Sequence, residues 1–167
     1  MSNPSSEGAP PFWPTFSFTL ICIALTGAYI TDVHFSNGVI FPLRDNFSLS
    51  YSEALIRGQL WRLLSYACFH LNASHLAGNL FLFLLVGPPV ERQLGVKSFL
   101  VIFVGSILAA GFIFLFFQAT SQIGSSVPVV GASGGVFGLL GAYAVLWGRE
   151  RTGILLILEL RIRSALS

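Results

Sequence analysis

Near its C-terminal end the chain reads Gly131-Ala132-Ser133-Gly134-Gly135-Val136-Phe137-Gly138-Leu139-Leu140-Gly141, a run of small and apolar residues with a single hydroxyl. The glycines at 134, 138 and 141 are four and three residues apart, so they share one face of a helix. In lipid, a face of this kind lets a neighbouring helix approach closely. The pattern therefore predicts a tightly packed helix that begins at Ser133.

This predicted helix is short for a membrane span. From Ser133 to Trp147 it contains about 15 residues, or roughly 22 Å at 1.5 Å per residue, whereas the hydrocarbon core of a bilayer is about 30 Å thick. We therefore expect the helix to start below the membrane surface, with Ser133 at its sunken end. A serine at a helix start is often only a cap, so a structural role and a chemical role both stay open.

The whole composition indicates an all-α integral membrane protein. Of its 167 residues, 54% are apolar and 10% are charged, against about 25% charged in soluble domains, and the mean hydropathy is +0.77. We predict a mobile N-terminal tail over residues 1–14 and one membrane domain over residues 15–167. The net charge of +2 gives no argument for nucleic acid. Cys22 and Cys68 lie in apolar stretches and are predicted to be buried thiols without a disulfide framework.

Uncharged apolar runs predict about four transmembrane spans. These spans cover residues 16–31, 76–90, 99–117 and 133–147. Pro88 and Pro89 are expected to end or kink the second span, and residues 91–97 to form a short polar connection after it.

Two other regions are less regular. The long first loop, residues 32–70, contains a predicted helical turn at 52–56, and its Trp61-Arg62 pair taken alone reads as an anchor at the membrane interface. Charged residues interrupt the final apolar run, so we interpret residues 153–167 as an incomplete span or an interfacial tail.

The distribution of charge predicts an orientation. With four spans, Arg92, Lys97, Arg149 and Arg151 fall on one side of the membrane, and the positive-inside tendency places that side in the cytoplasm. Ser133 then opens toward the outside or the lumen. The sequence shows no internal repeat, which speaks against a transporter.

Polar residues inside the predicted spans are candidates for function. His75 and Asn79 are four apart and so share a face at the start of the second span. Each could bond to a neighbouring helix, or both could donate hydrogen bonds to an oxyanion. His70 could line the same cavity or lie at the interface. Ser133 could be a nucleophile, because its flanking glycines leave room for a substrate backbone and amides at a helix start point toward an oxyanion.

The pattern Gly131-x-Ser133-x-Gly135 also matches the nucleophile elbow of soluble hydrolases. That fold needs an alternating α/β sheet and a histidine downstream of the serine. The chain has the composition of a membrane protein and no histidine follows Ser133, so we reject this interpretation.

Taken together, the sequence resembles the rhomboid family of intramembrane serine proteases from about residue 55 to residue 150. The resemblance rests on four motifs in register. They are Trp61-Arg62, then Phe69-His70 with His75-x-x-x-Asn79, then Glu91-x-x-x-Gly95, and finally Gly131-Ala132-Ser133-Gly134.

The resemblance implies a six-span helical core, of which about four spans are present, and cleavage of transmembrane substrates without a cofactor or a metal. It assigns Ser133 as the nucleophile, with the oxyanion bound by His75, Asn79 and the backbone amide of Ser133. His70, Gly131, Gly134 and Phe137 would support the cavity, and Trp61, Arg62 and Glu91 would be structural. The general-base histidine of the sixth span is absent, because His34, His70 and His75 all precede Ser133.

Three functions remain open from the sequence. The first is a rhomboid-type endopeptidase, of which this chain would be a truncated form. The alternative is a non-catalytic rhomboid-like binder or regulator of transmembrane clients in the lipid bilayer, which the missing base favours. A plain structural or small-solute membrane protein explains only the hydropathy.

Overall fold

The computed structural model describes residues 13–36, 46–120 and 127–148, and for residues 31–36 it describes the backbone alone. Six helical elements follow one another within these ranges. They are α1 (Trp13–Ser36), the π-helical turn η2 (Ser52–Ile56), α3 (Arg62–Ser65), the 3-10 turn η3 (Tyr66–Cys68), α4 (Ala73–Thr120) and α5 (Ser133–Trp147). An isolated antiparallel bridge between Leu49 and Val129 is the only β pairing in the described part of the chain. The all-α fold is confirmed, while the predicted tail at 1–14 falls almost entirely, and the segment at 153–167 wholly, outside the described residues.

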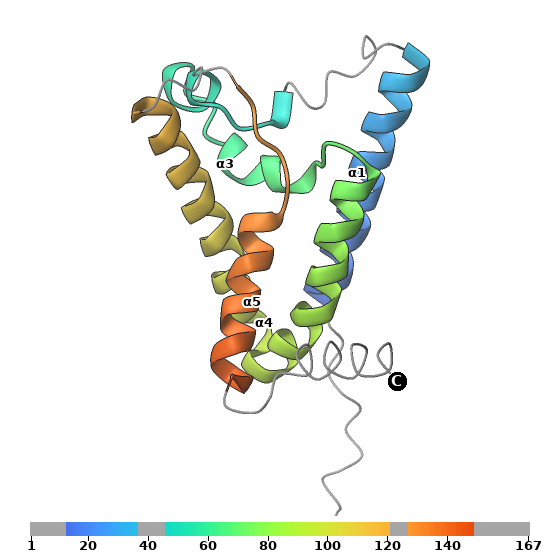
Figure 1. The fold of residues 1–167 in the computed structure, drawn as a ribbon, viewed down its shortest axis with the longest axis vertical. Coiled ribbons are helices and arrows are strands. Elements are labelled where there is room, and N and C mark those ends of the chain that lie inside the picture. The colour runs from blue at the N-terminus through green and yellow to red at the C-terminus, as the bar shows by residue number, and fades with distance from the viewer. Residues whose placement is uncertain (1–12, 37–45, 121–126, 149–167) are drawn as a thin grey trace, which may run out of the picture.

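Within the described part of the chain, two helices, α1 and α4, are long and apolar enough to cross a membrane. Helix α4 contains 48 residues and is broken at Gly95, where φ is 76° and ψ is 162°. Figure 1 shows its two limbs, residues 73–94 and 96–120, diverging like a V. The limbs correspond to the predicted second and third spans, each extended by several residues.

The break was predicted at the wrong place. Pro88 and Pro89 lie inside the first limb, which continues through them to the glycine at 95. Gly87 precedes the first proline and has no Cβ to clash with the ring, which lowers the penalty for a helical conformation there. Gly95 adopts a positive φ that other residues rarely accept. Most of the predicted connection at 91–97 is therefore helical.

Glycines fix the packing of α5 against the second limb of α4. A Cβ on Gly134 would lie 2.5 Å from Cβ of Ala110, and a Cβ on Gly138 would overlap Ser106. A Cβ on Gly135 would lie 2.5 Å from the ring of Phe103. At Gly141, in contrast, a Cβ meets nothing within 4 Å. The predicted glycine face is thus correct at 134 and 138 and wrong at 141, and it omits 135.

Aromatic rings and one carboxylate join α1 to both limbs of α4. The rings of Phe18, Phe83 and Phe103 meet with centroids 4.8 to 5.4 Å apart. Glu91 is buried in α4, and its Oε2 accepts the backbone N–H and the hydroxyl of Thr15 in α1. These contacts hold α1 beside the first limb (Figure 1).

Residues 46–72, which precede α4, pack over one end of the bundle (Figure 1). Arg62 is 3% exposed and donates to the carbonyl of Ser48 over 2.7 Å. Trp61 beside it is 55% exposed. The interpretation of this pair as a joint interfacial anchor is therefore wrong for the arginine, which bonds within the loop. Cys22 is buried, Cys68 is half-buried, and both are free thiols.

Candidate functional site

Ser133 is the first residue of α5, and its side chain is exposed. Ala132 occupies the N-cap position, and no side-chain hydrogen bond caps the helix. Among the residues that the structure describes, no hydrogen bond engages the Ser133 hydroxyl. The interpretation of this serine as a helix cap is therefore not supported, and its oxygen is accessible.

The imidazole of His75 lies close to the backbone of Gly131, two residues before Ser133. The φ of Gly131 is 130°, and its N–H donates to the carbonyl of Tyr66 over 2.9 Å. A Cβ at this position would lie 2.8 Å from Cε1 and 3.1 Å from Nε2 of His75. Glycine is therefore required at this position both for the backbone conformation and for the close approach of the His75 ring.

His75 and Asn79 both lie in the first turns of α4. Asn72 begins this helix, because its side-chain oxygen accepts the N–H of His75 and the hydroxyl of Ser74, each over 2.8 Å. Asn79 is 8% exposed, and its Nδ2 donates to the carbonyl of His75 over 3.0 Å. A side-chain amide carries two N–H groups, so a second donor remains on Nδ2.

His70, which was expected either to line the cavity or to lie at the membrane interface, is in the loop ahead of α4 and is 1% exposed. Its ring stands edge-on to that of His75, with 5.2 Å between the centroids. Nδ1 is 3.5 Å from the hydroxyl of Thr26 in α1, and Nε2 accepts the N–H of Ala132 over 3.4 Å. Burial, reinforced by His75, lowers the pKa of His70 to about 4, so the ring is neutral at pH 7.

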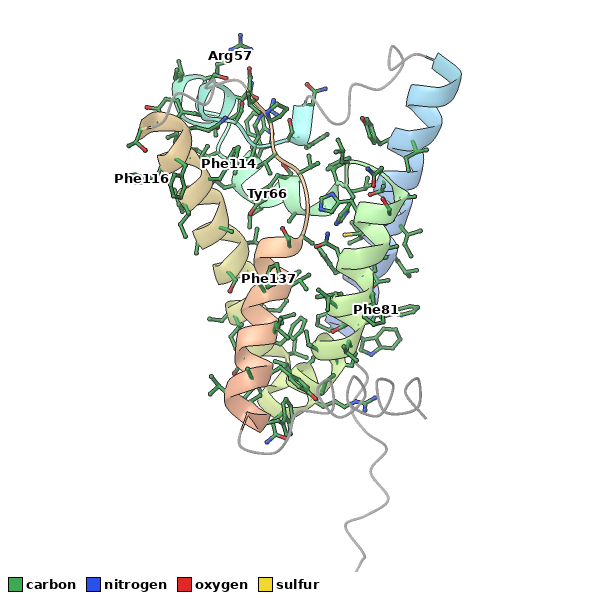
Figure 2. All side chains as sticks on the ribbon, viewed as in Figure 1. Arg57, Tyr66, Phe81, Phe114, Phe116 and Phe137 are labelled. Carbon is green, nitrogen blue, oxygen red and sulfur yellow. The ribbon has the colours of Figure 1, made fainter. Side chains whose placement is uncertain are left out.

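Tyr66, which the sequence did not single out, supports the same region (Figure 2). Its hydroxyl donates to the carbonyl of Ile107 in α4 over 2.7 Å, and its own carbonyl accepts the N–H of Gly131. Burial raises the pKa of Tyr66 to about 12. The residue therefore ties the second limb of α4 to the backbone that precedes Ser133.

Thr26 is the second contributor that the sequence did not single out, although a signal for it exists. Thr15, Thr19, Cys22 and Thr26 are spaced by four, three and four residues, and all are buried. This spacing defines one helix face. A stripe of small polar residues along an otherwise apolar span indicates a face that packs on protein and not on lipid.

Phe137 lies one turn after Ser133 and is 62% exposed (Figure 2). Its predicted place beside the cavity stays a prediction. Within the described ranges, no group of three or more His, Cys, Asp or Glu side chains is arranged to hold a metal ion. The site thus contains the accessible hydroxyl of Ser133, the imidazole of His75 beside Gly131, and the side-chain amide of Asn79, one turn after His75 in α4.

Comparisons with known proteins identify the family of the chain. Residues 57–162 match the family model of the Rhomboid domain. Human Rhomboid-related protein 3 is 34% identical over 137 residues, which cover 80% of this chain and 32% of that protein. The rhomboid protease GluP of Bacillus subtilis is 31% identical over 144 residues, covering 82% of this chain and 26% of that protein.

A third relative, the rhomboid protease GlpG of Pectobacterium atrosepticum, is 36% identical over 97 residues, or 58% of this chain and 33% of that protein. The chain thus spans about a third or less of the length of these three relatives. The family model nevertheless covers well over half of the chain and includes α4, which is long and apolar enough to cross a membrane. The chain is an integral membrane protein that belongs to the rhomboid family.

Proposed function

We propose that this chain carries the nucleophile and the oxyanion-binding part of an intramembrane serine endopeptidase that acts on transmembrane proteins. The observation that carries the proposal is the packing of the His75 ring on Gly131, two residues before the exposed Ser133. The Rhomboid family model, which matches residues 57–162, spans both His75 and Ser133. In this proposal no metal or cofactor takes part in the reaction.

Each residue then has a role in acyl transfer. The hydroxyl of Ser133 attacks the scissile carbonyl, and the negative charge develops on the carbonyl oxygen. Donors for that oxygen are the amide of Ser133 at the helix start, the His75 ring and the remaining N–H of Asn79. Removal of one such donor in an enzyme of this type lowers kcat by about 10²–10³.

A serine hydroxyl also needs a general base, because the protonated group is a weak nucleophile. In the described part of the chain, His70 bonds to Thr26 and Ala132 and does not bond to Ser133. The base is therefore expected from a group that approaches the exposed side of α5, where Ser133, Phe137 and Val145 are uncovered. The family resemblance points to a histidine on the sixth span.

The proposal includes an orientation. Figure 1 shows α5 running from its start toward the turn between the limbs of α4, where Arg92 and Lys97 lie. We place that turn in the cytoplasm and the Ser133 end toward the outside or the lumen. Single cysteines introduced at 93 and at 128 would then react with a membrane-impermeant maleimide from opposite sides.

The catalytic proposal is tested with a fluorophosphonate probe and a single-span substrate in liposomes. The protein is prepared as these 167 residues and with any coding sequence that continues past Ser167. We expect labelling and cleavage that Ser133→Ala abolishes in at least one form, and a strong reduction in His75→Ala. Labelling that survives Ser133→Ala, or its absence from every form, would refute the role of the serine.

A second candidate, a non-catalytic binder of transmembrane clients, is favoured by the lack of any described base at Ser133. In that case single-span proteins co-purify equally with the wild-type protein and with Ser133→Ala, and the probe labels neither. Loss of client binding in Ser133→Ala would count against the binder.

A further inference from the structure

One imidazole joins three separate parts of the fold. His70 lies in the loop between η3 and α4, its Nδ1 faces Thr26 in α1, and its Nε2 faces the backbone N–H of Ala132. Thr26 is 0% exposed and His70 is 1% exposed, so water has little access to either side chain. Ala132 is the N-cap residue of α5 and directly precedes Ser133.

The donors and acceptors fix the position of the ring proton. A neutral imidazole has one N–H donor and one acceptor nitrogen. The backbone N–H of Ala132 can only donate, so Nε2 of His70 must be the acceptor and Nδ1 must carry the proton. That proton points toward the hydroxyl oxygen of Thr26, which can accept it.

We propose that Thr26 is a positioning residue for Ser133, because it accepts the Nδ1 proton of His70 and thereby selects the tautomer that holds the amide of Ala132. The other tautomer would set two N–H groups against each other and leave a buried amide without an acceptor. The role in positioning the nucleophile rests on the proposed function, whereas the tautomer and the hydrogen bond to Ala132 do not.

Two features of the surroundings support this assignment. The lowered pKa of His70, about 4, keeps the ring neutral near pH 7, and only the neutral ring can accept the amide. Neighbouring positions of α1 such as Leu20, Ile21 and Ile23 are about half exposed, as expected for side chains that face lipid. Thr26 instead belongs to the buried polar stripe of α1 and faces the interior of the bundle.

The test uses the whole chain with ¹⁵N-labelled histidine and alanine in micelles at pH 7. The ring nitrogen shifts report the tautomer, and loss of a signal in His70→Gln identifies the resonances of that ring among the three histidines. Thr26→Val keeps the shape but removes the acceptor, and Thr26→Ser keeps the hydroxyl. We expect the Nδ1–H tautomer in the wild type and in Thr26→Ser, and a mixture of tautomers with faster amide exchange of Ala132 in Thr26→Val.

Labelling of Ser133 by a fluorophosphonate gives the catalytic readout. We expect about a tenfold lower rate in Thr26→Val, as for other residues that orient a functional group indirectly, and recovery of the rate in Thr26→Ser. An Nε2–H tautomer in the wild type, or unchanged shifts and labelling in Thr26→Val, would overturn the proposal. If no form is labelled, but the His70 tautomer and the amide exchange of Ala132 still change in Thr26→Val, the proposed enzymatic function is refuted. The hydrogen bonds that link Thr26 through His70 to Ala132 are then still supported.

Discussion

Gly135→Ala tests the packing of the short central helix. This glycine faces the second limb of α4, where an added Cβ would lie 2.5 and 2.7 Å from ring carbons of Phe103 and 2.9 Å from Cγ1 of Ile107. Carbon atoms in contact are normally about 3.5–4.0 Å apart. The ring would therefore have to move by about 1 Å to accept the methyl group.

The ring of Phe103 has little room for such a movement. It is 4% exposed and lies between three other rings, with centroids 4.8 Å from Phe18, 5.1 Å from Phe83 and 5.9 Å from Phe99. An extra methyl in a packed core costs about 1–3 kcal/mol. The change from glycine to alanine within a helix returns about 1 kcal/mol.

Gly141→Ala is the matched control, because it lies in the same helix and its Cβ would meet nothing within 4 Å. Helix propensity acts equally on both variants and cancels in their difference. We therefore expect Gly135→Ala to be less stable than Gly141→Ala by about 1–3 kcal/mol, while Gly141→Ala equals or exceeds the wild type. The sequence pattern alone predicts the opposite order, because it includes Gly141 in the packed face and omits Gly135.

The free energy of unfolding is measured by titration of the chain from mild micelles into sodium dodecyl sulfate, followed by circular dichroism. Phe103→Leu provides a second check, because a smaller side chain should reduce the penalty of Gly135→Ala in the double variant. Equal unfolding midpoints for the two alanine variants would refute the close packing of Gly135 on Phe103. A midpoint for Gly141→Ala below that of Gly135→Ala would refute it also.

Three further changes test other contacts. Tyr66→Phe removes the hydroxyl that donates to Ile107 over 2.7 Å, and we expect a loss of about 1 kcal/mol in the same titration. Thr15→Val removes one of the two donors to Oε2 of Glu91, whose Oε1 has no partner within the described residues. We expect the free energy of unfolding to fall by about 1–3 kcal/mol, a loss that Thr15→Ser largely avoids. The pKa of His70 is about 4 in the fold against 6.5 for a free ring, so the unfolded state binds more protons between these values and stability falls as pH drops from about 6.5 toward 4. His70→Gln should lack that part of the pH dependence. A free energy of unfolding equal to that of the wild type in Tyr66→Phe or Thr15→Val, or an unchanged pH dependence in His70→Gln, would contradict the corresponding contact.

The sequence predicted the elements of the bundle more accurately than their contacts. The bounds of α5 agree with the prediction, because a polar loop precedes Ser133 and Gly148 follows Trp147. The break in α4 was misplaced. The residue before the first proline is Gly87, which lowers the penalty for a helical conformation there, and the non-helical residue is Gly95. Periodicity also identified part of the packed face of α5 without showing that a Cβ at Gly141 would meet nothing within 4 Å.

The residues of the candidate site also differ in whether the sequence alone could identify them. Ser133, His75 and Asn79 could be singled out because a polar group inside an apolar span stands out against its surroundings. Thr26 and Tyr66 could not be singled out in the same way, since a threonine in a helix and a tyrosine in a loop are common. Their importance comes from partners 41 to 44 residues away along the chain. Such partners become visible only when the helices are placed in space.

The position of Ser133 is determined mainly by the loop that precedes α4. The N–H of Gly131 bonds to Tyr66, and the N–H of Ala132 bonds to His70, so two successive residues before the serine are held by one short segment. That segment is in turn anchored to α1 through Thr26 and to α4 through Ile107. Lipid touches neither of these bonds directly, because Tyr66, His70 and Thr26 are all buried. A change in bilayer thickness or helix tilt can therefore reach the nucleophile by moving α1 or the second limb of α4 relative to this loop, or by moving the first limb, whose His75 ring lies against Gly131.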